Sequence, residues 1–192
     1  MSFFSKNTVV MALSLTALLA GISSYAATPA AAATKLSTLG GKFAFSLPTG
    51  YIARPLPPGD AKNGTAGATG TMYVNKDEKR VIIAAENALP NGLKASDNDD
   101  VFLDNSVAGF VRQQSEALPG FKQTSENRMT IKGLGIREID STATMGGGNT
   151  LNTTFLSGSG NHMSVVQVVS RADDQAGHSA LIKRIIEGLK AR

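Results

Sequence analysis

Two short segments of this chain are apolar on both sides of a strand, and they restrict its possible folds more than any other feature. They are Val81–Ala85 and, apart from Gln167, Val165–Val169. Side chains alternate between the two faces of a strand, so a strand that is apolar throughout has to be covered on both faces. The sequence therefore predicts a sheet with a covering layer on each side.

Two amphipathic segments have the spacing of helices that cover such a sheet. The first runs from about residue 97 to Leu118 and begins in a capping box, Ser96–Asp99, in which Asp97 is a competing cap. The second runs from Asp174 to Lys190 after the capping pattern Ser170–Asp173. Their apolar stripes are Leu103, Val107, Phe110, Val111 and Leu118 in the first, and Leu181, Ile182, Ile185, Ile186 and Leu189 in the second.

The remaining apolar segments read as strands. Phe43, Phe45 and Leu47 alternate with polar or small residues, and Pro48 ends that strand. A polar turn joins two further strands into a hairpin, and short Gly/Asn turns join four more into a meander. These strands are 71–75 and 80–86, then 121–131, 135–145, 150–156 and 162–170. We therefore predict an α+β fold with an antiparallel β-sheet of about six to seven strands, flanked by two main helices.

The first 26 residues have the pattern of a bacterial signal peptide. Lys6 precedes an apolar run from Thr8 to Ile22, and small residues lead to a cleavage site after Ala26. Cleavage after Ala33 also fits, and an uncleaved N-terminal anchor is the alternative. The chain has no cysteine, so it is not a lipoprotein, and we expect it in the periplasm.

Residues 27–37 are rich in Ala, Thr and Pro and are interpreted as a flexible tether, since Pro29 disfavours an Ala-rich helix. Residues 38–192 are interpreted as a single α+β domain. Within it, Arg54–Gly59 favours an extended, polyproline-like path. Asn63–Gly70 is a Gly-rich loop, read either as a flap over a binding face or as a surface loop.

Motifs that carry chemistry are weak in this sequence. The absence of cysteine excludes thiolate chemistry, and a formal charge of +4 spread along the chain resembles no nucleic-acid-binding patch. Gly146–Gly148 leads into a strand rather than a helix, which favours a hairpin turn over a phosphate cradle. His178 has no metal-binding partner one turn on, and Asp97, Asp99 and Asp100 lack the pattern of a calcium loop. We therefore predict no cofactor, no metal site and no enzymatic activity.

Several strings resemble the DcrB family of bacterial envelope proteins. They are Gly41–Pro48, Ile139–Ser141, Gly160–Asn161 and Ala172–Gln175, within a resemblance from about Leu36 to Leu189. The resemblance implies an antiparallel sheet flanked by helices, similar to the photosystem protein PsbP. It also implies a role in envelope integrity and in the entry of phages and colicin-like agents, with no catalytic residues. Relatives can be lipoproteins, whereas this chain has no cysteine to lipidate.

Three hypotheses for the function follow. The first is a periplasmic accessory protein that binds an envelope or membrane protein, an apolar segment or a lipid. The second is a chaperone for transmembrane segments, with Met72, Tyr73, Met145 and Met163 as the partner-binding residues, because flexible methionines suit varied apolar partners. The third is a hydrolase in which Ser159 is the nucleophile and His162 its base.

Overall fold

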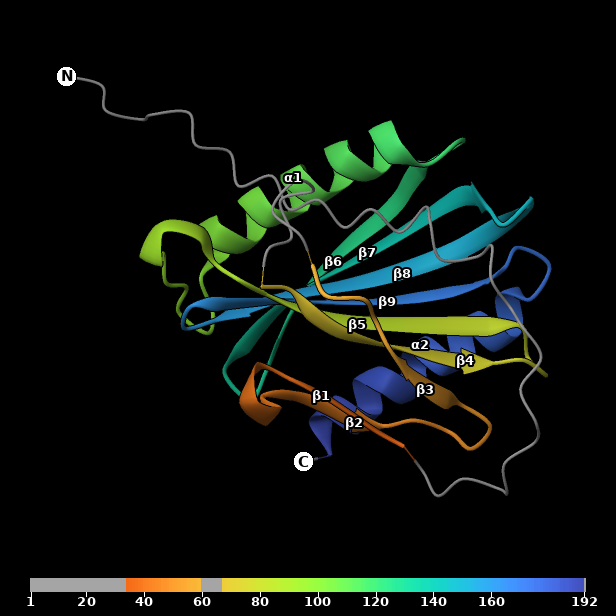
Figure 1. Cartoon of the computed structure of the whole chain (residues 1–192), viewed down its shortest axis with the longest axis horizontal. Helices are drawn as coiled ribbons and strands as arrows, with labels where there is room; N and C mark the ends of the chain where they lie inside the picture. Colours follow the sequence, from red (N-terminus) through yellow and green to blue (C-terminus); the bar gives the residue numbers. More distant parts are fainter. Residues whose placement is uncertain (1–33, 60–66, 192) are drawn as a thin grey trace.

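A computed structural model of the chain describes residues 34–59 and 67–191 (Figure 1). Within these ranges the helices are α1 (Asp100–Ala117) and α2 (Gln175–Lys190), with short 3₁₀ turns η2 (Leu39–Gly41) and η3 (Pro90–Gly92). The strands are β1 (Lys35–Thr38), β2 (Phe43–Ser46), β3 (Ile52–Pro55), β4 (Thr69–Asn75), β5 (Arg80–Ala88), β6 (Lys122–Ile131), β7 (Leu134–Met145), β8 (Gly148–Ser159) and β9 (His162–Arg171). None of the helices in the described ranges has the length and apolarity needed to span a lipid bilayer.

Seven of these strands form one antiparallel sheet in the order β3-β4-β5-β9-β8-β7-β6. The two strands predicted from their apolar runs, β5 and β9, pair with each other near its centre. The β4–β5 hairpin and the β6–β9 meander are confirmed, and Gly146 and Gly147 form the turn between β7 and β8. The predicted α+β architecture is therefore confirmed.

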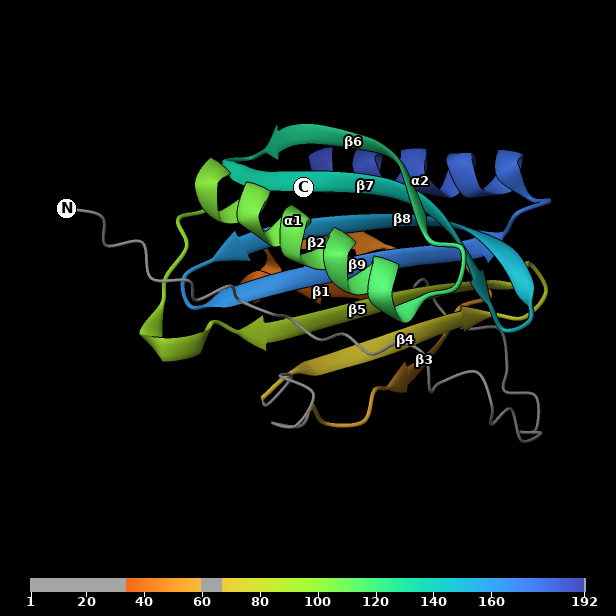
Figure 2. The ribbon, with the colours of Figure 1, turned by 90° about the horizontal axis from the view of Figure 1, so that it is seen from above.

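The two helices lie on opposite faces of this sheet (Figure 2). α1 packs mainly against β7 and β8 on one face. On the other face α2 packs on β8 and β9, and the separate β1–β2 hairpin contacts α2 through β2 and the sheet through the contact of β1 with β5. The α2 face is therefore covered along most of its width, whereas α1 covers only one half of the opposite face.

Each face of the sheet has its own apolar core. The larger core lies on the α2 face, where the ring of Phe43 contacts those of Phe45 and Phe155 at centroid distances of 6.1 and 6.0 Å. The smaller core lies beneath α1 and includes Phe110, Ile139 and Leu156. Alternation along each central strand supplies both cores, which explains why β5 and β9 are apolar on both sides.

Both helices begin later than their capping patterns predict. The N-cap of α1 is Asp99, whose carboxylate accepts from the backbone N–H of Phe102 at 2.9 Å. The predicted competitor Asp97 instead binds Lys42 and Ser159. The N-cap of α2 is Asp174 rather than Ser170, the first residue of the predicted capping pattern, because the Asp174 side chain accepts from the N–H of Gly177. In each helix the cap is the residue whose side chain can reach the second or third helical N–H.

The predicted boundary of the tether is wrong at its C-terminal end. Residues 35–37 belong to β1, and the side chain of Leu36 is fully buried because it fills the core between β2 and α2. Arg54 and Pro55, at the start of the predicted polyproline-like path, belong to the edge strand β3, which pairs with β4. The signal peptide, with Ala26 and Ala33, and residues 63–66 of the Gly-rich loop lie outside the described residues.

Candidate functional site

The described part of the sheet offers two candidate sites, and the first is an apolar surface beside α1. Four β-branched residues lie directly opposite one another across β3, β4, β5 and β9: Ile52, Val74, Val81 and Val169. Ile52 is 52 % exposed, and the other three are half-buried. We call this row, with Met72 and Arg54 beside it, the bare face.

The bare face follows from how the helices are distributed. α1 lies over β7 and β8, and the described elements leave this side of β3 and β4 without a covering helix (Figure 1). A contiguous apolar patch with a polar rim is typical of a surface that binds another molecule. Arg54 pairs with Met72 across the β3–β4 ladder and supplies part of such a rim.

The second candidate site is a groove of about 710 Å³ between α2 and the strands β6, β7 and β8. Apolar side chains from β8 and α2 form part of its wall, including Leu151, Ile182 and Ile186. Its floor carries the acids Glu138 and Asp140 of β7, and Lys183 lies at its rim. A concave site with an apolar wall and a few polar groups is the usual form of a small-molecule site.

A chain of hydrogen bonds runs beneath α2 at the end of this groove. The Nδ1 of His178 lies 2.8 Å from Ser170 Oγ, and its Nε2 lies 2.9 Å from Thr153 Oγ1. Thr153 Oγ1 donates to Asp140 at 2.5 Å, and Ser125 Oγ donates to the same carboxylate at 2.6 Å. Since Thr153 donates its one proton to Asp140, it accepts from Nε2–H, which leaves Nδ1 to accept from Ser170.

The pKa directions in the groove reflect burial. Burial lowers the pKa of His178 below its ordinary value, in keeping with the neutral ring that this hydrogen-bond pattern assigns. Burial and the neighbouring charge of Asp140 raise the pKa of Glu138. The hydroxyl that lies against His178 Nδ1 is also enclosed, because Ser170 is 1 % exposed. The chain of hydrogen bonds therefore orders α2 on the sheet and is not a catalytic triad.

The four predicted partner-binding residues do not lie together. Met72 lies on the bare face, but Tyr73 points to the opposite face, where it is buried in the larger core. Met163 is 3 % exposed in the core beneath α1, and Met145 is half-buried at the far end of β7. Neighbouring residues in a strand face opposite ways, which separates Met72 from Tyr73.

The structure does not join Ser159 to His162 as nucleophile and base. The two residues pair across the β8–β9 ladder, but Ser159 Oγ donates to Asp97 Oδ1 at 2.7 Å and accepts from Lys42 Nζ at 2.9 Å. The hydroxyl proton is therefore not available to His162, which is exposed. Lys42 also lies 2.7 Å from Asp97 and, with the Ser159 hydroxyl, lowers the pKa of that carboxyl. These contacts tie the start of β2 to the loop before α1.

Sequence reasoning missed the polar side chains of the groove. Glu138 and Asp140 stand two residues apart in a predicted strand, and His178 precedes the apolar stripe of α2 by one turn. The spacing of His178 matches the buried face of α2, and this signal could have identified it. Glu138 and Asp140 lie in a polar segment, which carries no such signal. Among the residues that the structure describes, no group of three or more His, Asp or Glu side chains is placed to hold a metal ion.

The fold was compared with those of known proteins. CyanoP, the cyanobacterial PsbP of Synechocystis sp. PCC 6803, has a TM-score of 0.56 and 10 % identity over 87 % of this chain and 96 % of its own. A protein of unknown function from Pseudomonas aeruginosa has a TM-score of 0.46 and 15 % identity over 81 % of this chain and 94 % of its own. LpqN, involved in cell envelope biogenesis of Mycobacterium tuberculosis, has a TM-score of 0.42 and 15 % identity over 73 % of this chain and 76 % of its own.

No family model matches the chain, and no curated protein matches it. At 10 % identity the likeness to CyanoP concerns the fold and not the activity. Membership of the DcrB family stays a prediction from its short sequence strings. What the comparisons do confirm is the architecture that the resemblance implies: the chain has a PsbP-like α+β fold.

Proposed function

We propose that this protein is a non-enzymatic accessory protein of the bacterial cell envelope that binds an envelope or membrane protein through its bare face. The signal-peptide pattern of residues 1–26 supports export to the periplasm. The strings shared with DcrB support a role in envelope integrity and in the uptake of phages or colicin-like agents. The PsbP-like fold is compatible with such an accessory role, and the proposal assigns no catalytic residue.

One observation carries the proposal: the uneven covering of the sheet. α2 and the β1–β2 hairpin cover one face, whereas the other face presents Ile52, Val74, Val81 and Val169 beside α1. A β-branched row that serves only the fold of a monomer is expected to lie beneath a second layer. A partner that packs on this row removes apolar surface from water, which stabilises the complex by roughly 25 cal/mol per Å² of buried apolar surface.

Site-specific photo-cross-linking in the periplasm tests this proposal. A photoreactive residue replaces Val74 on the bare face in one strain and Arg184, an exposed residue of α2 outside the groove, in the control strain. We expect a discrete envelope-protein adduct from position 74 and none from position 184. Abundant folded protein without an adduct at position 74, or the same adducts at both positions, refutes the use of the bare face. Met163 is unsuitable for the probe because it is buried.

A chaperone that shields transmembrane segments is the second candidate function. It is favoured by Met72, whose flexible side chain lies beside the β-branched row and adapts to varied apolar surfaces. An apolar 20-residue helix peptide, labelled with a fluorophore, should then stay in solution when the purified protein is present. The double variant Val74→Lys and Val81→Lys should lose this effect, while Lys183→Ala should retain it. Equal aggregation of the peptide with all three proteins would exclude the chaperone function.

A further inference from the structure

The groove beneath α2 contains a buried carboxyl group that no described residue satisfies. Glu138 is 7 % exposed, lines the groove and accepts no hydrogen bond within the described ranges. Its neighbour Asp140 differs, because Thr153 and Ser125 donate to its two oxygens. A carboxylate offers about four acceptor positions. Asp140 can therefore accept further hydrogen bonds, and Glu138 has all of its acceptor positions available.

The Glu138 carboxyl oxygens reach the groove, because neither is among the fully buried polar atoms without a partner. A carboxylate with little surface in contact with water is poorly solvated, so a cationic partner stabilises its charged form. Glu138 and Asp140 are two residues apart on β7, so their side chains project from the same face at positions about 7 Å apart. Two adjacent acids in an apolar groove favour a cationic occupant.

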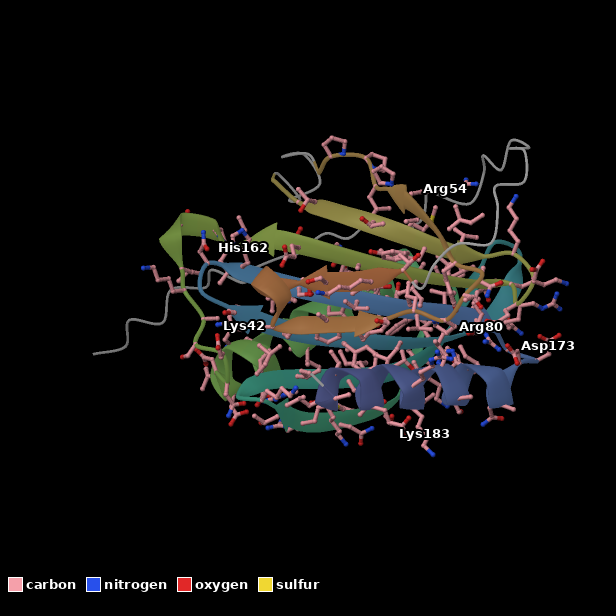
Figure 3. All side chains as sticks on the ribbon, turned by 90° about the horizontal axis from the view of Figure 1, so that it is seen from below. Lys42, Arg54, Arg80, His162, Asp173 and Lys183 are labelled. Carbon is pink, nitrogen blue, oxygen red and sulfur yellow. The ribbon has the colours of Figure 1, made fainter. Side chains whose placement is uncertain are left out.

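Nearby groups of the protein do not fill this position. Lys183 lies at the rim of the groove, where it is 78 % exposed and 3.9 Å from Glu187 (Figure 3). His178 uses both ring nitrogens in hydrogen bonds to Ser170 and Thr153, and burial lowers its pKa. A metal ion is disfavoured because the described residues offer no set of three ligands.

We infer that this groove binds an organic cation whose ammonium or guanidinium head lies between Glu138 and Asp140. The aliphatic stem packs against Leu151, Ile182 and Ile186 on the groove wall. The head donates hydrogen bonds to both carboxylates. Such charge-assisted hydrogen bonds are stronger than those between neutral groups. The groove is on the α2 face and the bare face is on the α1 face, so this inference does not depend on the proposed function.

Titration calorimetry on the purified protein tests the inference with two sources of the same chemistry. The probes are 1,5-diaminopentane, as a free diamine, and a short lysine-containing peptide, as a side chain presented by a partner. We expect saturable binding of at least one probe, and the probe that binds more tightly identifies the source. The neutral analogue 1,5-pentanediol should not bind, because it lacks the positive charge.

Two matched variants locate the site. Glu138→Gln should weaken binding about tenfold or more, as expected when a hydrogen bond to a charged group is lost. Glu116→Gln removes the same charge from an exposed position of α1 and should leave the binding affinity unchanged. Glu138→Gln should still fold: because the pKa of Glu138 is raised, its ionisation lowers stability as the pH rises, and the amide removes that effect. Thermal unfolding of Glu138→Gln, compared with the wild type, shows whether the variant is folded.

Any one of three results overturns the inference. The first is the absence of saturable binding of both probes to folded wild-type protein at millimolar concentration. The second is binding that Glu138→Gln and Glu116→Gln weaken to the same extent. The third is equal binding of the diamine and the pentanediol, because the acids would then make no contribution. None of these results bears on cross-linking at the bare face, so the two ideas fail separately.

Discussion

Replacing the two acids that hold Arg137 should destabilise this protein more than replacing Arg137 itself. Arg137 of β7 lies beneath α1 with 2 % of its side chain exposed. Its guanidinium donates to Asp104 Oδ1 at 2.9 Å and to Asp100 Oδ1 at 2.6 Å. Asp100 and Asp104 are themselves 68 % and 41 % exposed. The cation of this ion pair is therefore buried, while both anions reach solvent.

The magnitudes follow from this difference. Asp100→Asn combined with Asp104→Asn leaves a buried guanidinium without a countercharge, which costs about 3 kcal/mol or more. That loss lowers Tm by roughly 6–12 °C in a chain of this size. Arg137→Met keeps much of the side-chain volume and returns both carboxylates to water, so we expect a cost of about 1 kcal/mol or less. The helix dipole adds at most about 1 kcal/mol for each acid removed from the first turns of α1.

Urea unfolding at neutral pH, followed by circular dichroism, measures these differences. Arg128→Met is the control, because Arg128 is 60 % exposed and lies 3.2 Å from the same Asp104. It should change the free energy of unfolding by less than about 1 kcal/mol. If Arg137→Met is as destabilising as the double acid variant, the assignment of the cost to the buried cation is wrong.

Three further predictions concern stability. Burial lowers the pKa of His178, so the unfolded chain takes up this proton first as the pH falls below about 6.5. The free energy of unfolding should therefore fall as the pH is lowered from 7 to 5, and it should fall less steeply in His178→Gln. Equal slopes for the wild type and this variant would contradict the prediction. Gly177→Ala should destabilise α2 despite the better helix propensity of Ala, because the new Cβ meets the guanidinium of Arg80. Ser179→Ala, at an exposed position of the same helix, is the control. A higher Tm for Gly177→Ala than for the wild type would contradict the clash. Phe155→Ala should lower the unfolding free energy by about 3–5 kcal/mol, since Phe155 is fully buried; a loss below about 1 kcal/mol in urea would show that the core collapses around it.

The strands at the centre of the sheet were predictable because burial on both sides leaves a direct mark on sequence. Val81–Ala85 and Val165–Val169 became β5 and β9, and the Gly/Asn turns placed the meander correctly. The covering helices were predictable for the same reason, through their apolar stripes. These elements depend on local patterns, which a single sequence displays.

Other elements depend on contacts between distant parts of the chain. β1 has little hydrophobic pattern of its own, and its one fully buried residue, Leu36, is fixed by pairing with Phe45. The edge strand β3 likewise forms because β4 supplies its hydrogen bonds, although Pro55 ends it. Glu138 reads as a surface residue in a polar segment and becomes buried only when α2 closes over β7. Such placements cannot be derived from spacing alone.

The first strand of the small hairpin also sets how far the domain can stand from a membrane. If export ends with cleavage after Ala26, eight residues, 27–34, precede β1. If the leader instead stays in the membrane, its apolar run ends at Ile22 and residues 23–34 form the connection. Twelve residues span about 42 Å at most when fully extended. The domain would then be confined to a thin layer beside the bilayer, where it would meet membrane proteins far more often than a freely diffusing domain.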